Sequence, residues 1–239
     1  MKLKRFSMVA IAALCLLMAG MASAYEVVEV EDGGSLAGKI TTKAAGATAT
    51  IEVTKDLATC HATVPDESVV VGEGGGLANC VVYFIDVESG KNPKGMPAVE
   101  LRNEGCRYVP HVQSVTVGTQ LVITNEDPVL HNTHTYDANE KTVFNLALPI
   151  QGQTIKKRMK KPGLINAKCD AGHTWMNGYV WVIENPYHTF TDANGDFEIA
   201  DIPEGDYTVV VWHEKFGTSE HDVTIDAGAA ADFTASIGE

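Results

Sequence analysis

The sequence predicts an all-β fold. Long runs with helical periodicity are nearly absent from its 239 residues. Short segments rich in Val, Ile, Thr and Tyr alternate instead with clusters of Gly, Pro, Asn and Asp, which is typical of strands joined by turns. We expect strands over residues 68–71, 80–87, 115–124, 179–183, 196–199 and 207–213.

The first 24 residues have the three parts of a secretory signal peptide. A basic start is followed by a short apolar run and by Ala-Ser-Ala at residues 22–24. The run is too short to favour a permanent membrane span, and no second long apolar run follows. We therefore expect cleavage after Ala24 and a mature chain, residues 25–239, in the periplasm or outside the cell. Its length of about 215 residues suits one large or two small domains.

The mature chain is strongly acidic. Removing the signal takes away three positive charges and no negative ones, so the net charge moves from −13 to −13 − 3 = −16. This balance argues against nucleic acid and anionic membranes and favours cationic partners. Five basic residues crowd between Lys156 and Lys161, and we interpret them as part of a solvated, exposed strand.

Three residues near the C-terminal third offer a set of metal ligands. Cys169, His173 and Met176 lie within eight residues of one another. A thiolate, an imidazole and a thioether are ligands of mononuclear copper electron-transfer sites, in which a His₂Cys set with a long axial Met suits both oxidation states. The second imidazole must come from elsewhere, and His131 is the first choice. Taken singly, a Cys is more often a buried apolar residue or half of a disulfide, and a Met is more often core filler.

Other histidines offer weaker candidates. His134, close to His131, is a reserve ligand and is otherwise a polar residue on an exposed strand. His111 is a second reserve ligand, because it could approach from an adjacent strand. Four histidines are interpreted as surface or hydrogen-bonded structural residues: His61, His188, His213 and His221.

Four cysteines remain in the mature chain, and an exported protein can form disulfides. The absence of any CxxC or CxxCH motif disfavours a zinc ribbon and covalent haem. If Cys169 binds a metal, one disulfide and one free thiol are expected. We predict a Cys60–Cys106 disulfide, because both residues lie in polar, turn-like stretches. Cys80 lies in an apolar strand, where a buried thiol is well tolerated.

Residues 98–184 resemble the cupredoxins of the plastocyanin–amicyanin type. The resemblance lies in residues 117–134, which end in Leu-His-Asn-Thr-His, and in residues 162–182, which contain Pro-Gly, the Cys and the following ligand loop. It implies a Greek-key sandwich of roughly 85 residues, copper held by the four candidate ligands, and Asn132 bracing the two loops. It also implies that His173 lies near the surface as the electron exit.

The ligand loop departs from that family in one respect. Three residues separate Cys169 from His173, where plastocyanin-like and amicyanin-like loops have two. Gly172 can absorb the extra residue by adopting a positive φ. The longer loop is similar to that of the binuclear copper centre of cytochrome oxidase, but that centre needs a second Cys where this chain has His173. We therefore expect one copper, and Met176 is the ligand whose position the longer loop affects most.

A second resemblance frames this segment. GSLAGKI at residues 34–40 and the TDANGDFEIADIPEGDYTV stretch within residues 188–214 are similar to the carboxypeptidase regulatory-like, transthyretin-like β-sandwich. We infer that residues 98–184 are inserted into a domain formed by residues 25–97 plus 185–239, since an exposed loop tolerates insertion. Two domains in tandem, with a lone C-terminal hairpin, are the alternative, and the marginal stability of isolated hairpins disfavours it.

Together these features predict an exported mononuclear copper protein for single-electron transfer, with a redox protein such as a c-type cytochrome as partner. An enzyme is not expected, because no nucleophile–base pair, paired carboxylates or phosphate loop can be recognised. A copper carrier or sequestration protein and a metal-free β-sandwich binding module remain alternatives. A coloured, reversibly reducible copper adduct separates the first interpretation from the third, and ready loss of copper to a chelator favours the second.

Overall fold

The computed structural model describes residues 25–46 and 49–238, and the predicted signal peptide lies outside them. These residues form twenty strands, one short helix, α1 (Leu57–Cys60), and one 3-10 turn, η1 (Glu73–Gly75). The predicted all-β fold is confirmed. No helix in the described part of the chain is long and apolar enough to cross a membrane.

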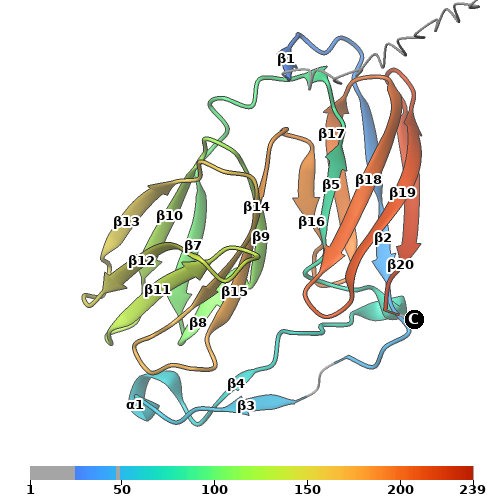
Figure 1. Cartoon of the computed structure of the whole chain (residues 1–239). Coiled ribbons are helices and arrows are strands. Elements are labelled where there is room, and N and C mark those ends of the chain that lie inside the picture. The colour runs from blue at the N-terminus through green and yellow to red at the C-terminus, as the bar shows by residue number, and fades with distance from the viewer. Residues whose placement is uncertain (1–24, 47–48, 239) are drawn as a thin grey trace, which may run out of the picture.

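The middle of the chain forms a sandwich of two sheets, which we call the first sandwich (Figure 1). One sheet contains, in spatial order, β13 (Thr154–Arg158), β10 (Gln120–Asn125), β7 (Val99–Glu104) and β8 (Arg107–Val109). The other contains β12 (Thr142–Leu148), β11 (His131–Tyr136), β14 (Gly163–Lys168), β15 (Asn177–Ile183) and β9 (Val112–Thr116). Buried side chains from both sheets, such as Leu101, Ile123 and Val180, share one hydrophobic core.

Two further sheets form the second sandwich. One contains β16 (His188–Phe190), β5 (Val81–Ile85), β18 (Gly205–His213) and β19 (Gly217–Ile225). The other contains β17 (Asp196–Ile202), β2 (Gly34–Thr41) and β20 (Ala230–Ser236). Their shared core includes Leu36, Phe84 and Val209. A short parallel pair, β1 (Glu26–Val27) with β6 (Ser89–Gly90), precedes the chain's entry into the first sandwich.

We propose that the two sandwiches are two domains, with residues 98–184 inserted between residues 25–97 and 185–239. Two pairings support this organisation: β2 pairs with β17, and β5 pairs with β18, although more than a hundred residues separate the partners in sequence. The C-terminal strands thus complete sheets that the N-terminal strands begin. A small cluster that includes Val112 and Trp212 lies where the two sandwiches touch.

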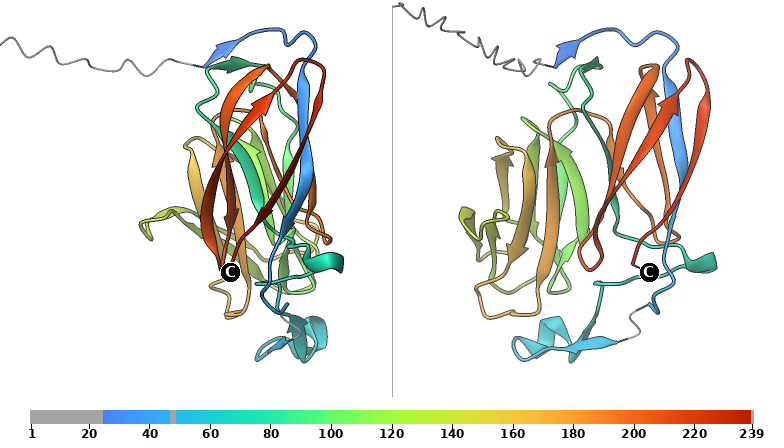
Figure 2. Two further views of the ribbon diagram at one scale, coloured as in Figure 1. Left: turned by 90° about the vertical axis from the view of Figure 1, so that its right-hand side faces the viewer. Right: turned by 45° about the vertical axis from the view of Figure 1, so that its right-hand side comes forward.

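Residues 50–65, which we call the cap, leave the second sandwich and cover one end of the first (Figures 1 and 2). In the cap, β3 (Thr50–Glu52) pairs with β4 (Thr63–Pro65), and α1 lies between them. Val53, Cys60 and Val64 pack into the core of the first sandwich rather than the second. The sequence analysis did not predict this structure.

The disulfide prediction is confirmed. Cys60, at the end of α1, is bonded to Cys106 in the turn between β7 and β8, with a Cα–Cα distance of 5.2 Å. Cys80 is free and buried, as expected, and Cys169 is free and buried as well.

Two strand predictions are wrong. Residues 115–124 were expected to be one strand, but the chain turns at Gly118, whose φ is 90°, and so passes from β9 in one sheet to β10 in the other. No strand covers residues 68–71, because Ser68 takes part in a turn, where its backbone N–H donates to the Asp66 side chain. Three of the five basic residues, Lys156, Lys157 and Arg158, lie on β13, which is a sheet edge with alternating exposed side chains. Lys160 and Lys161 are exposed but follow the end of this strand.

Candidate metal centre

Strand pairing brings three buried side chains to the end of the first sandwich that the cap covers. Cys169 directly follows β14, and His173 lies in the loop from β14 to β15. His131 is the first residue of β11, which pairs with β14. Because β14 pairs with both β11 and β15, the sheet fixes the thiol and places the two imidazoles beside it.

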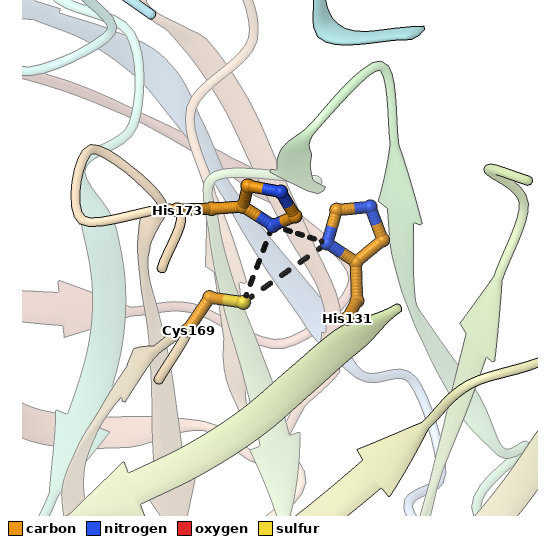
Figure 3. A group of neighbouring side chains, drawn as sticks. All are labelled: His131, Cys169 and His173. Carbon is orange, nitrogen blue, oxygen red and sulfur yellow. Dashed lines mark hydrogen bonds between the residues drawn. The ribbon is translucent and has the colours of Figure 1, made fainter. Parts of the chain in front are cut away.

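The three side chains point toward one another (Figure 3). The Cys169 Sγ lies 4.0 Å from His131 Nδ1 and 3.6 Å from His173 Nδ1, and the two Nδ1 atoms are 3.1 Å apart. Both histidines are fully buried, and Cys169 is 4% exposed. A metal ion with Cys and His ligands needs bonds of about 2.0–2.3 Å. These three donors could therefore hold one ion among them.

Each of the two histidines contacts a carboxylate through its Nε2 atom, the ring nitrogen that does not face Cys169. His131 Nε2 is 2.8 Å from Asp127 Oδ2, and His173 Nε2 is 2.8 Å from Asp56 Oδ2. The Asp127 carboxylate in turn accepts hydrogen bonds from the backbone N–H groups of Gly105 and Cys106. A carboxylate at Nε2 favours the tautomer that carries its proton there, which leaves Nδ1 free to bind a metal.

The pKa shifts of these side chains follow from burial and from the hydrogen bonds just described. Burial would raise the pKa of Asp127, but its hydrogen bonds with His131 and the two backbone N–H groups outweigh burial and lower it. Burial would lower the pKa of His131, but the hydrogen bonds with Asp127 and Cys169 outweigh burial and raise it. For His173, burial dominates and lowers the pKa despite the hydrogen bond with Asp56. His173 therefore favours the neutral form that a metal requires.

The two loops are braced as expected. Asn132 accepts a hydrogen bond from the Asp170 backbone N–H at 3.1 Å, and its own backbone N–H donates to Cys169 Sγ at 3.4 Å. Gly172 has a φ of 96°, so it absorbs the extra residue between Cys169 and His173 as predicted.

Met176 and Trp175 complete the ligand loop. The Met176 side chain is 2% exposed and belongs to the same core as Cys169, and its backbone N–H donates to the His173 carbonyl at 3.0 Å. The Trp175 ring lies 5.2 Å from the His173 ring, and its Nε1 donates to the Cys106 carbonyl. Both side chains help to exclude water from this end of the sandwich.

The reserve ligands are not in the cluster. Side chains alternate along β11, so His134 faces away from His131 and contacts Asp170, Thr142 and Tyr136 instead. His111 bonds to the Asn177 carbonyl and to the Glu214 carboxylate. A second group of ligand-type atoms joins Cys106, Asp127 and His131, but the Cys106 sulfur is already in a disulfide.

One implication of the cupredoxin resemblance is wrong. His173 was expected near the surface, yet it is fully buried. The cap causes the difference, because Asp56 occupies the position beside Nε2 where solvent or a partner would lie.

Sequence reasoning missed both carboxylates. Asp127 lies four residues before His131, so a search for acidic residues beside candidate ligands would have found it. Asp56 lies 117 residues from His173 and has no local signal.

One family model matches the C-terminal part of the chain. Residues 177–237 match the family model of the carboxypeptidase regulatory-like domain, which confirms that resemblance. The match begins within β15 of the first sandwich and does not include β2 or β5, which the structure pairs with its strands. No curated protein matches the chain.

Solved cupredoxins are among the structural matches. A purple cupredoxin from Nitrosopumilus maritimus is 27% identical over 36% of this chain and 98% of its own, with a TM-score of 0.31. Amicyanin from Paracoccus versutus is 18% identical over 42% of this chain and 96% of its own, with a TM-score of 0.32. The copper-containing nitrite reductase from Thermus scotoductus SA-01 is 23% identical over 38% of this chain, with a TM-score of 0.32, and the match spans only 23% of the reductase.

Proposed function

We propose that the protein is an exported mononuclear copper protein that transfers single electrons and catalyses no bond-making reaction. His131, Cys169 and His173 would hold the copper, with the Met176 thioether as a fourth ligand. The observation that carries this proposal is the convergence of two imidazole Nδ1 atoms and one thiol in a buried site. Bound copper would supply a one-electron couple between its two oxidation states.

The chain's own residues serve such a couple by limiting rearrangement. The β14 ladder fixes Cys169, and Asp127 and Asp56 fix the two imidazoles. Because the donors are already close together, binding costs little reorganisation. The surrounding core excludes water, which strengthens every electrostatic contact with a bound ion.

A redox partner would meet an acidic protein. The predicted mature charge of −16 favours association with a positively charged electron carrier, such as a c-type cytochrome, through long-range attraction. This part of the proposal depends on export and on signal removal.

A second function is favoured by one observation. Both histidines are fully buried and the cap covers the Nε2 side of His173, whereas an electron carrier gains from a ligand edge near the surface. A closed site suits a copper carrier or sequestration protein. A chelator distinguishes the two functions: slow copper loss with fast, reversible reduction supports electron transfer, and ready loss supports carriage.

Copper loading of the purified exported protein tests the proposal. We expect one copper per chain, a thiolate-to-copper absorption band and a Cu(II) paramagnetic resonance signal that disappears on reduction. Cys169→Ser should remove the band and weaken binding, because the thiolate dominates such sites. Cys80→Ser is the matched control, since Cys80 is also a buried free thiol but lies in the core of the second sandwich.

Two results would overturn the copper site. One is stoichiometric copper binding with the same spectrum in the Cys169→Ser variant. The other is a lack of copper binding by both the wild-type protein and the Cys80→Ser control. That result would leave the metal-free binding module as the better interpretation.

A further inference from the structure

The cap contacts the ligand loop through two polar interactions. Asp56 bonds to His173 Nε2, and Lys55 Nζ donates to the backbone carbonyl of Ala171. Gly172 lies against the same lysine: a Cβ at this position would be 3.0 Å from Lys55 Cδ. A glycine at this position of the longer loop therefore leaves space for the Lys55 side chain of the cap. The unusual loop length is thus compatible with the cap.

The cap is anchored unevenly. Val53, Cys60 and Val64 are buried in the core of the first sandwich, and the disulfide joins Cys60 to Cys106. The contacts over the ligand loop are more open, because the Asp56 side chain is 33% exposed and Lys55 is exposed. The polar edge can consequently open while the buried edge and the disulfide stay in place.

The disulfide also connects the supports of the two histidines. Cys60 lies four residues after Asp56, which holds His173. The backbone N–H of Cys106 donates to Asp127, which holds His131. A single covalent link thus joins the two segments that orient both imidazoles.

We propose that the cap is a tethered lid on the metal centre, with Asp56 as the positioning residue for His173 and as the latch that must open before copper enters or leaves. This inference rests on the proposed copper site and adds the route by which the metal is exchanged. The latch consists of the Asp56 and Lys55 contacts, and the tether is the Cys60–Cys106 disulfide. No covalent step is involved.

Thiol reactivity tests the lid without any metal. Metal-free protein with its disulfide intact is treated with iodoacetamide, and peptide mapping gives the alkylation rates of Cys169 and Cys80. Asp56→Ala removes the latch and should raise the Cys169 rate roughly 10- to 100-fold, the range expected for losing a hydrogen bond to a charged group. The Cys80 rate should not change, because that thiol is buried in the core of the second sandwich.

Two further variants separate the latch from a general loss of structure. Asp56→Asn keeps a hydrogen-bond acceptor and tolerates the left-handed φ of 52° at this position but loses the charge, so its Cys169 rate should lie between those of wild type and Asp56→Ala. Glu52→Ala removes an exposed carboxylate from β3 of the same cap and should leave both rates unchanged. A rise in the Cys80 rate of Asp56→Ala, or an equal Cys169 rise in Glu52→Ala, would overturn the latch.

Copper transfer then tests the lid on the loaded protein. Release of Cu(I) to bathocuproine disulfonate should follow the same order of variants, and the Cys60→Ala/Cys106→Ala double variant should release copper faster than Asp56→Ala. Unchanged Cys169 alkylation and unchanged copper release in Asp56→Ala would refute the lid while leaving the copper site intact. Faster Cys169 alkylation in a protein that binds no copper would support the lid and refute the proposed function.

Discussion

The residues behind the histidines determine how well the site is organised. Asp127 accepts hydrogen bonds from two backbone N–H groups and orients His131. Asp56 orients His173 in the same way. Such supporting residues typically change metal affinity by 10–100-fold when removed. Neither carboxylate is a ligand, yet both fix which ring nitrogen is available.

We predict that Asp127→Ala weakens copper binding about 10- to 100-fold and broadens the copper spectrum, because His131 loses its orientation. Competition titration against a chelator of known affinity measures the first effect. Glu126→Ala is the matched control, since Glu126 is an adjacent, exposed carboxylate. Equal losses in the two variants would mean that Asp127 acts only through charge.

The ligands themselves should differ in what they control. His131→Ala and His173→Ala should each disrupt the copper spectrum, because each removes an imidazole donor. Met176→Leu conserves volume in the core and should mainly shift the reduction potential. Protein-film voltammetry and absorption spectra check both effects. Loss of the thiolate band in Met176→Leu would show that the thioether is needed to build the site.

The candidate site could be predicted from the sequence only where the signal is local. Cys169, His173 and Met176 lie in one loop, and His131 lies in a recognisable stretch, so spacing and ligand chemistry sufficed to nominate them. Asp56 could not be found in this way, because its contact with His173 depends on how the cap folds back over the sandwich. For the same reason the burial of His173 was missed.

At the level of elements, the composition of the sequence predicted most of the strands it named, but it predicted their first and last residues less well. The apolar strand at residues 80–87 and the strand at residues 207–213 correspond to β5 and β18, where β-branched and aromatic residues are concentrated. The cap could not be predicted from the sequence, because strands of three residues and a helix of one turn show no measurable periodicity. Its stability comes from the disulfide and from burial of a few side chains.

The junction of β9 and β16 offers a pH-dependent contact between the sandwiches. His188 on β16 bonds to Ser114 Oγ at 2.8 Å and to Thr116 Oγ1 at 2.9 Å, both on β9. Burial, aided by the positive charge of Lys91, lowers the pKa of His188 to about 4. The folded state therefore disfavours the protonated ring, whose ordinary pKa is near 6.5.

We predict that stability falls as the pH decreases from 6.5 toward 4. In this window the unfolded state binds more protons at His188 than the folded state, so the free energy of unfolding rises with pH and levels off above 6.5. Between pH 7.5 and pH 5 the His188 contribution should be about 2 kcal/mol or less. His188→Gln should lose this contribution. Urea unfolding at both pH values, compared between wild type and variant, isolates it from other histidines.

On the scale of the whole molecule, the two sandwiches differ in how the chain builds them, and the basic residues are unevenly distributed. The second sandwich completes its sheets with strands from both ends of the chain, and the first sandwich carries the candidate metal centre at its capped end. The basic residues of β13 lie on an edge strand at the side of the first sandwich, and Figure 1 shows the cap below that sandwich. If the predicted signal peptide is removed, ten basic residues outside the 156–161 cluster face thirty-one acidic ones, so most of the remaining surface should be acidic.

The acidic surface should guide a positively charged redox partner toward the protein. Reduction by a cationic c-type cytochrome should slow as salt is added, since attraction between exposed charges is screened beyond about 10 Å at 0.1 M ionic strength. Charge reversal at Lys156, Lys160 and Lys161, whose side chains are exposed, should speed reaction with the cationic partner and slow reaction with an anionic one. Lys157 and Arg158 are left unchanged, because they contact Phe144 and the Gly118 carbonyl.

Lys94→Glu provides the control, since it makes the same single charge change at an exposed position in the loop after β6. If steering depends on net charge alone, Lys94→Glu and Lys156→Glu should raise the association rate with the cationic cytochrome equally. A larger effect of Lys156→Glu would place the docking surface near β13. Stopped-flow rates that respond neither to ionic strength nor to any of these substitutions would leave electrostatic docking without support.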